Sequence, residues 1–320
     1  MPVAESYLDP QTLASVGSLQ LRARMIVEGI MNGQHRSPYQ GFSIEFAQHR
    51  QYAPGDDIRH LDWKVFGRTD KLYLKQYQQE TNLEMVIALD RSGSMNFSSD
   101  PGKTKTNWRK YDYGAALAVA LSYLALQQQD RVGLQLFDEH VRDATRQSNT
   151  HEHWRSIVEI LSHQAFGNTT EPDEAIGHGT DLNRVFEEIL ARQQQRSLIV
   201  LISDLFDDLD MLQQALAKAA HRRFDVIVLQ ILDPAEITFP YRSMADFVGL
   251  EGQGKITVHP TAIRKAYLEA FNEHLTQVQN ITRKFRFDYL KMNTAQPLGP
   301  ALSHFLARRN ASVARQAARR

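Results

Sequence analysis

The stretch ALDRSGSMN at residues 88–96 carries three oxygen-bearing side chains at alternate positions. An aliphatic run ends in Asp90, and Ser92 and Ser94 follow at every second residue. Alternate side chains of an extended turn point to the same side, so one carboxylate and two hydroxyls can meet at one point. Hard oxygen ligands of low total charge suit Mg²⁺, and also Mn²⁺, which keep several water ligands in octahedral geometry. The spacing therefore predicts a metal site.

Three ligands do not fill an octahedron, so this hypothesis requires further ligands from other parts of the chain. GHGTDLN at 177–183 offers Thr180 just before an expected helix, and SLIVLISD at 197–204 offers Asp204 at the end of an aliphatic run. We expect both residues at the same edge of the fold as Asp90, because the carboxyl ends of parallel strands share one edge.

Strand and helix patterns alternate along the part of the chain that carries these residues. Four aliphatic runs without polar alternation predict strands covered on both faces: 83–90, 131–138, 197–204 and 224–233. Helical periodicity lies between or after them at 111–129, 153–163, 181–194, 208–220 and 261–281, followed by a further strand at 285–292. This alternation predicts an α/β fold with a doubly wound, mostly parallel sheet.

Each of the four aliphatic runs ends in an aspartate, namely Asp90, Asp138, Asp204 or Asp233. Aspartate is common at this place for a structural reason, because it caps helices and begins turns. Whether such an aspartate is a candidate metal ligand or a helix cap has to be judged from its neighbouring residues. Asp90 is followed by two serines, and Asp204 lies at the same expected edge, so these two are the candidate ligands.

The predicted organisation has three parts. Residues 1–80 have mixed charges, aromatic residues and possible strands at 42–52 and 72–78, and we interpret them as a β-rich segment. Residues 81–307 form the α/β domain, and the arginine-rich residues 308–320 form a basic flexible tail. The mixed-sign stretch at 49–64 is either an ion-paired scaffold or a second docking surface, and the sequence leaves both open.

Composition excludes several classes of function. Lys plus Arg and Asp plus Glu both number 37 among 320 residues, so no net charge favours nucleic acid or a membrane surface. The absence of cysteine excludes disulfides, thiol catalysis and zinc–thiolate sites. The amino terminus lacks a signal-peptide pattern, and the longest apolar runs are too short to span a membrane. We expect a cytoplasmic protein without membrane insertion.

The candidate ligands resemble the metal-ion-dependent adhesion site of von Willebrand factor A-type domains. Asp90, Ser92 and Ser94 match the first loop of that site. Thr180 matches its second loop and Asp204 its third. The resemblance implies that the two serines and the threonine ligate the metal, whereas the aspartates act directly or through water.

A second resemblance covers most of the chain. The stretches 33–69 and 232–236 are similar to the bacterial domain-of-unknown-function family 58, whose members are von Willebrand A-like proteins. That resemblance implies partnership with a MoxR-type AAA+ ATPase in chaperone-like complex assembly or maturation.

These observations lead to a non-enzymatic, Mg²⁺-dependent protein-interaction module. Two aspartates neutralise a divalent cation, so the metal retains room for one anionic ligand, which we expect to be an acidic side chain of a partner protein. A metal-dependent, phosphatase-like hydrolase that uses the same carboxylates is the alternative, with Asp138 or Asp233 as the nominated base. A metal-free scaffold is the third possibility, and the complete set of five ligand positions argues against it.

Overall fold

The computed structural model describes residues 19–34, 49–52, 61, 63–75, 83–99, 108–165, 180–193, 195–250, 254–299, 302–303 and 307. The chain divides into two compact units, of which one comprises residues 1–32 and 82–305 and the other residues 33–81 and 306–320. The smaller unit contains helix α4 (Trp63–Thr69) and the antiparallel strands β1 (His49–Gln51) and β2 (Tyr73–Lys75). Helix α3 (Leu19–Gln34) also falls within the first 80 residues, so this segment contains helices as well as strands. The boundaries at 80/81 and 307/308 stay predictions.

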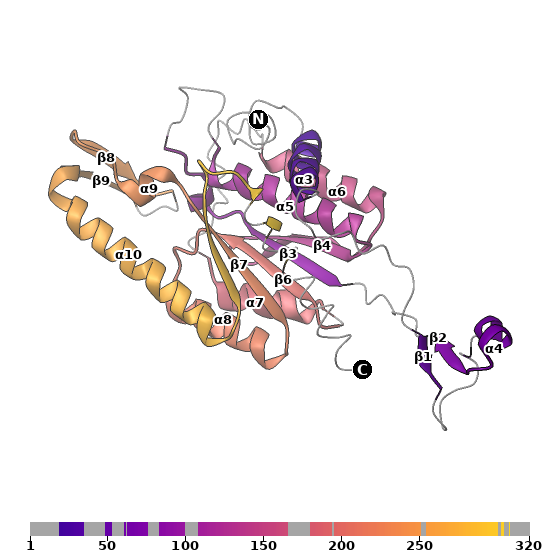
Figure 1. Cartoon of the computed structure of the whole chain (residues 1–320). Coiled ribbons are helices and arrows are strands. Elements are labelled where there is room, and N and C mark those ends of the chain that lie inside the picture. Colours follow the sequence, from indigo (N-terminus) through magenta and orange to yellow (C-terminus); the bar gives the residue numbers. More distant parts are fainter. Residues whose placement is uncertain are drawn as a thin grey trace. The chain divides into compact units, whose positions relative to one another are not determined.

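The larger unit is built on a six-stranded sheet (Figure 1). Its strand order is β10-β7-β6-β3-β4-β5, and all neighbours are parallel except β4 and β5. The strands are β3 (Glu84–Asp90), β4 (Arg131–Phe137), β5 (Val141–Ala144), β6 (Leu198–Ser203), β7 (Asp225–Leu232) and β10 (Asp288–Asn293). The predicted doubly wound, mostly parallel α/β fold is therefore confirmed.

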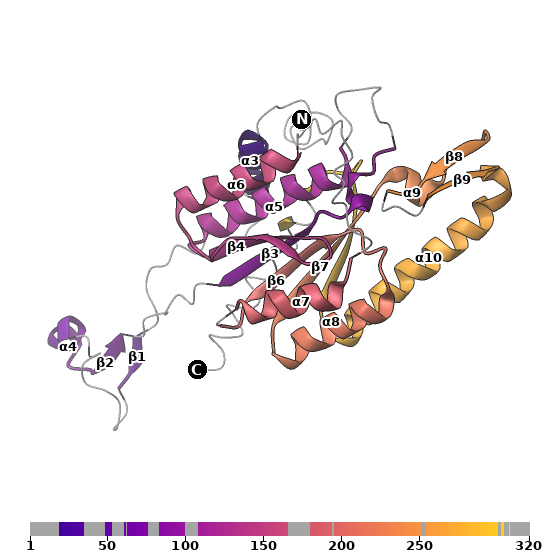
Figure 2. The ribbon, with the colours of Figure 1, turned by 180° about the vertical axis from the view of Figure 1, so that it is seen from behind.

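Helices cover both faces of this sheet, as Figures 1 and 2 show from opposite sides. Helices α5 (Lys110–Gln127) and α6 (His151–Ala165) lie on one face. Helices α7 (Leu182–Ala191), α8 (Leu209–His221) and α10 (Pro260–Lys284) lie on the other. Helix α5 is apolar on every side and almost wholly buried, as expected of a helix enclosed between a sheet and another helix.

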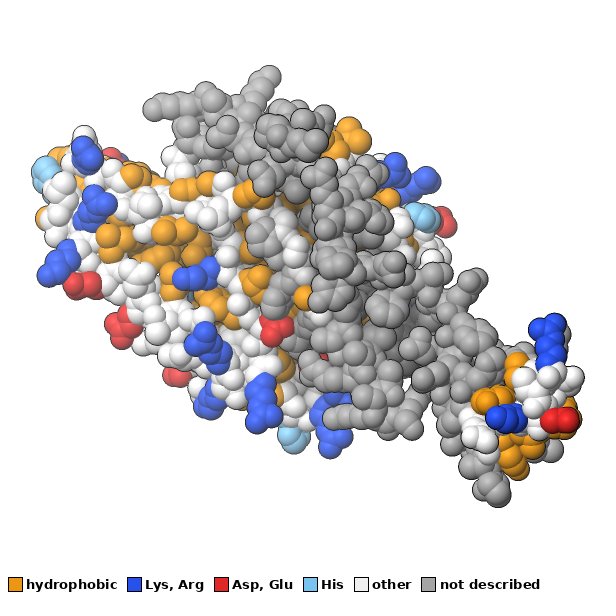
Figure 3. Space-filling model, in the orientation of Figure 1, with side chains coloured by type: hydrophobic (Ala, Val, Ile, Leu, Met, Phe, Trp, Pro, Cys, Tyr) orange, Lys and Arg blue, Asp and Glu red, His pale blue; other side chains and the backbone are white. Residues whose placement is uncertain are grey.

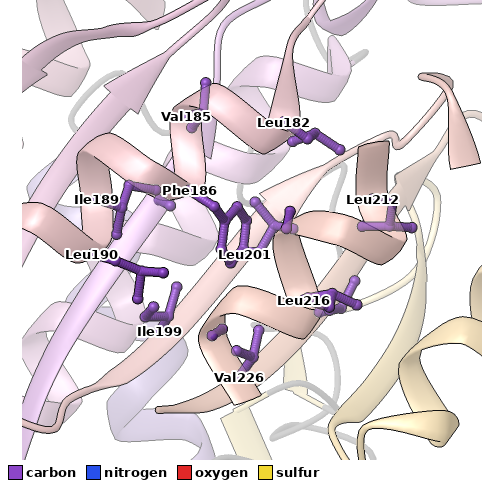
Figure 4. Packing of buried hydrophobic residues seen from close by; sticks show 14 of the residues in the cluster. Leu182, Val185, Phe186, Ile189, Leu190, Ile199, Leu201, Leu212, Leu216 and Val226 are labelled. Carbon is purple, nitrogen blue, oxygen red and sulfur yellow. The ribbon is translucent and has the colours of Figure 1, made fainter. Parts of the chain in front are cut away.

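The packing follows the alternation of side chains along the strands. Val86 and Ala88 of β3 point to the same face as Ile199 and Leu201 of β6, and all four belong to the core cluster under α7 and α8. Figure 4 shows how the apolar faces of these two helices meet the sheet. The labelled cluster residues are Leu182, Val185, Phe186, Ile189, Leu190, Ile199, Leu201, Leu212, Leu216 and Val226. Burial of this apolar surface holds the strand ends in place.

The strand order creates a switch point between β3 and β6. The chain continues from β3 through α5 to β4 on one side, and from β6 through α8 to β7 on the other. The loops that follow β3 and β6 therefore diverge at the carboxyl edge of the sheet. In open α/β sheets this is where ligands bind.

Several short elements were not anticipated from the sequence. Strand β5 pairs antiparallel at the sheet edge, helix α9 (Pro234–Thr238) follows β7, and strands β8 (Ala245–Val248) and β9 (Lys255–Val258) form a hairpin. Segments of four or five residues are too short for a hydrophobic period to identify.

Close packing of α5 on the sheet leads to a prediction about Gly114. A Cβ at this position would lie 2.8 Å from Leu89 Cδ1 and 3.0 Å from Ile231 Cδ1. We expect Gly114→Leu to lower the free energy of unfolding by about 1–3 kcal/mol or more, because the larger side chain forces strand and helix apart. Denaturant unfolding measures this change. Gly114→Ala is the matched control, because a gain in helix propensity of about 1 kcal/mol offsets its one close methyl contact. Equal stability of Gly114→Leu and Gly114→Ala would contradict the packing argument.

Candidate metal centre

The loop after β3 brings its carboxylate and hydroxyls together. Asp90 is fully buried, and its Oδ1 accepts a hydrogen bond of 2.8 Å from the backbone N–H of Ser92. The chain then turns through a short 3₁₀-helix (Gly93–Asn96), which places Ser92 Oγ 3.0 Å from Ser94 Oγ. The predicted proximity of these three side chains is present at the end of β3.

The loop after β6 lies beside the loop after β3. Leu89 pairs with Ile202 in the parallel ladder, and one residue further along Ser203 Oγ donates a hydrogen bond of 2.6 Å to Asp90 Oδ2. Asp204 follows and is also buried. Burial raises the pKa of Asp90 to about 7, and the negative charge of Asp204 adds to the rise. The sheet therefore places both predicted aspartates in one electrostatic environment.

The backbone around Asp204 is held in an unusual conformation. Leu205 has a φ of 56°, in the left-handed region that a branched side chain rarely adopts. The Gln230 side chain donates a hydrogen bond of 2.7 Å to the carbonyl of Asp204, and Tyr289 donates one of 2.6 Å to Gln230. His274 Nε2 lies 2.7 Å from the carbonyl of Leu205. Such over-determined strain is typical of functional sites, where it orients a side chain.

Thr180 connects to the same loop through its backbone. It is half-buried and precedes α7, whose amino terminus is capped by the Asp181 side chain. The Thr180 N–H donates a hydrogen bond of 3.3 Å to Asp207 Oδ1, and Asp207 lies in the segment that follows β6. The second and third loops are therefore joined. Residues 166–179 lie outside the described residues, and ligation by the Thr180 hydroxyl stays a prediction.

Lys110 is a residue of this site that the sequence analysis missed. Its side chain is 1% exposed, and its Nζ donates hydrogen bonds of 2.6 Å to Asp204 Oδ2 and 2.7 Å to Glu236 Oε1. Burial opposes the charged form, but the carboxylates of Asp204 and Glu236 outweigh this effect and raise the pKa of Lys110. The one available signal was a lysine at the start of an otherwise apolar helix.

The other two strand-end aspartates have structural roles. Asp233 is the N-cap of α9, where its side chain accepts from Ala235 N and completes a capping box with Glu236. Asp138 accepts a hydrogen bond of 2.8 Å from Arg142 Nε. Asp138 also accepts a hydrogen bond of 3.4 Å from the backbone N–H of His140, so both aspartates have the capping and turn roles that are common at strand ends.

The donor set matches the ligand preference of Mg²⁺. Within the described residues, no group of three or more His, Cys, Asp or Glu side chains is arranged to hold a metal, so a metal centre here would need hydroxyl ligands as well. The Asp90 oxygens accept hydrogen bonds from Ser92 and Ser203, and a carboxylate has about four lone-pair sites in all. Carboxylate and hydroxyl oxygens are hard ligands that suit Mg²⁺ or Mn²⁺. The five candidate ligand positions stay a prediction.

The surface next to this edge is partly apolar. Large hydrophobic side chains are exposed in and around the β8–β9 hairpin, among them Met244, Val248 and Ile256. Figure 3 shows hydrophobic side chains gathered over the region of this hairpin and α9.

Among the described helices, none combines the length and the apolar character that crossing a bilayer requires.

Comparison with known proteins gives one family match. The family model described as "Protein of unknown function DUF58" matches residues 48–277. Uncharacterized proteins of Mycobacterium tuberculosis and Mycobacterium bovis are 23% identical over 305 residues, which is 94% of this chain and 90% of theirs. The crystal structure of the conserved hypothetical protein BatB from Bacteroides thetaiotaomicron is 18% identical, with 73% of this chain and 100% of that chain covered and a TM-score of 0.48.

The environment of Asp90 predicts how the metal-free protein responds to pH. A pKa raised from 3.8 to about 7 means that the folded state binds the extra proton, so the free energy of unfolding falls as pH rises through this window. In chelator, Asp90→Asn should melt at least ~3 °C above the wild type at pH 8, because the neutral amide needs no proton. At pH 5 the difference should be smaller.

Thermal melting across pH 4–8 measures this difference. Asp138→Asn is the matched control, since Asp138 also ends a strand but pairs with an arginine. If the melting temperatures of the wild type and of Asp90→Asn change with pH in the same way, the pKa of Asp90 is not raised by its surroundings.

Proposed function

The chain belongs to the family described as protein of unknown function DUF58, and we propose that it is a non-enzymatic, Mg²⁺-dependent protein-interaction module. One observation carries this proposal. Asp90 with Ser92 and Ser94 at the end of β3, and Asp204 at the end of β6, adjoin at the switch point of the sheet, where α/β folds bind ligands.

In this proposal Asp90, Ser92, Ser94, Thr180 and Asp204 hold the metal. When bound, the divalent cation supplies an electrophilic centre with a coordination position for one anionic ligand. The hydrogen bonds from Ser92 N and Ser203 Oγ orient the Asp90 carboxylate, and the backbone around Leu205 orients Asp204. We propose that the anionic ligand is a Glu or Asp side chain of a partner protein.

Two further observations favour interaction over hydrolysis. A hydrolase needs a general base beside the metal, but Asp138 is occupied by Arg142 and Asp233 by the backbone of α9. The exposed hydrophobic side chains around the β8–β9 hairpin are of the kind that protein partners cover. The site therefore has the features of a recognition surface more than those of a catalytic pocket.

The partner that we propose is a MoxR-type AAA+ ATPase, on the basis of the family resemblance. In this proposal the two proteins act together in chaperone-like complex assembly or maturation in the cytoplasm. A chain without cysteine fits that location.

Metal binding is tested by calorimetric titration of Mg²⁺ into chelator-treated protein. We expect the wild type to bind Mg²⁺, Asp90→Ala to lose binding, and Ser92→Ala and Ser94→Ala each to weaken it roughly tenfold, about 1.4 kcal/mol, because each removes one ligand. Asp138→Ala is the control and should bind as the wild type does.

Absence of Mg²⁺ uptake by the wild type, or equal uptake by Asp90→Ala, would overturn the metal centre. Phosphatase turnover that requires both Mg²⁺ and Asp90 would instead establish the hydrolase.

The partnership is tested by co-purification with a MoxR-type AAA+ ATPase from the same cell. Chelation alone does not discriminate, because such an ATPase needs Mg²⁺ for its own nucleotide. Substitution of the ligand does discriminate. The wild type and Asp138→Ala should retain the ATPase, whereas the amount of ATPase retained by Asp90→Ala should fall at least ~tenfold, because the metal bridge is absent. If Asp90→Ala retains the ATPase as well as the wild type does, and circular dichroism shows an intact fold, recognition does not depend on a metal bridge.

A further inference from the structure

A buried lysine lies in direct contact with the candidate metal centre. Lys110 is the first residue of α5, and its ammonium donates to Asp204 Oδ2 at 2.6 Å and to Glu236 Oε1 at 2.7 Å. Its Nζ also lies 5.0 Å from the centre of the Phe206 ring and 5.8 Å from that of Phe97. Two of its three N–H groups are thus directed at carboxylates, and two aromatic rings shield the ammonium from water.

This lysine holds one carboxylate oxygen of a candidate metal ligand. Lys110 is bonded to Oδ2 of Asp204, while no hydrogen bond from the described residues reaches Oδ1 of Asp204. The hydrogen bond from Gln230 to the Asp204 carbonyl keeps the backbone in position. One oxygen of the carboxylate is therefore committed to the ammonium, and in the proposed centre the other would face the metal or a metal-bound water.

The net charge of these contacting side chains matches that of one divalent cation only when the positive charge of Lys110 is included. Asp90, Asp204 and Glu236 carry three negative charges when ionised, and Lys110 carries one positive charge. The remainder of two negative charges equals what one divalent cation neutralises. Asp233 stands outside this sum because it does not contact Lys110: its carboxylate accepts from the N–H groups of Ala235 and Ser99.

We propose that Lys110 sets the charge of the metal centre, so that the site takes a divalent cation and still attracts an acidic side chain. Without the ammonium, three carboxylates would bind the metal more tightly and leave a net negative charge, which repels an anionic ligand. With it, the metal is held less tightly and stays electrophilic. Lys110 is thus a specificity-determining residue that does not itself ligate the metal. This inference rests on the proposed function.

The test compares Mg²⁺ affinity by calorimetry in the wild type, Lys110→Met and the double variant Lys110→Met/Glu236→Gln. Methionine keeps the length and volume of the side chain but removes its charge. We expect Lys110→Met to bind Mg²⁺ at least tenfold more tightly than the wild type. The double variant has the same net charge as the wild type and should return to within about threefold of its affinity.

Two further measurements separate a role in charge from a role in shape. The trivalent ion Tb³⁺ feels a removed positive charge more strongly than Mg²⁺ does, so Lys110→Met should raise the affinity for Tb³⁺ by the larger factor. Lys218→Met is the matched control, because Lys218 also pairs with a glutamate, Glu187, but on the surface of α8. Its Mg²⁺ affinity should stay within about threefold of the wild type.

The outcomes distinguish this inference from the proposed function. Mg²⁺ binding by the wild type that is lost in Asp90→Ala, together with unchanged or weaker binding in Lys110→Met, would overturn the role of Lys110 and leave the metal centre standing. If Lys110→Met and the double variant lose Mg²⁺ affinity to the same extent relative to the wild type, Lys110 only positions Asp204 and does not set the charge of the site. If the single variant does not fold by circular dichroism, the double variant alone decides, since a loss of affinity greater than tenfold there overturns the proposal. No binding by any of the proteins would overturn both proposals.

Discussion

Two buried carboxylates at the boundary between β3 and β6 impose the main constraint on this structure. Asp90 and Asp204 lie at the carboxyl edge of a parallel sheet, away from water, and the charge of Asp204 disfavours the ionised form of Asp90. A buried negative charge has to be met by hydrogen bonds, by a cation or by a proton. The surrounding residues supply the first two in part, through Ser92 N and Ser203 Oγ at Asp90 and through Lys110 at Asp204.

The rest of the larger unit supports this arrangement. The strand order makes the chain leave β3 and β6 in opposite directions, which opens a place for a ligand between their loops. Helix α5 is buried on all sides and begins with Lys110, so the packing of the helix fixes where the ammonium enters. Gln230 and Tyr289, from β7 and β10, hold the backbone of the third loop from below. Stability and site geometry therefore depend on the same core.

A site of this kind favours recognition of an anionic group. In the proposed metal centre, hydroxyl and carboxylate ligands would leave a divalent cation electrophilic, and the buried ammonium would reduce the negative charge around it. The exposed hydrophobic residues around β8 and β9 add an apolar surface that follows α9 in the chain, and α9 carries Glu236, the second partner of Lys110. The candidate metal ligands, Lys110 and the apolar surface thus belong to neighbouring segments of the domain.

The sequence by itself determined the five parallel strands of the sheet and the local arrangement of the first loop. Four aliphatic runs without polar alternation predicted covered strands. The fifth parallel strand and the helices were predicted from their own patterns, all within a few residues of the observed bounds. The alternation of Asp90, Ser92 and Ser94 likewise made their proximity predictable, because it depends on local backbone geometry.

Only the tertiary structure decided which charged groups share the site. The contact between Lys110 and Asp204 joins residues 94 positions apart, and the contact between Lys110 and Glu236 joins residues 126 positions apart. No local pattern encodes such pairs, since they arise when α5 packs on the sheet and α9 follows β7. The left-handed backbone of Leu205 is also a tertiary outcome. Its carbonyl contacts His274 Nε2 and its N–H donates to Ser203 Oγ, and these contacts hold a conformation that the residue itself disfavours.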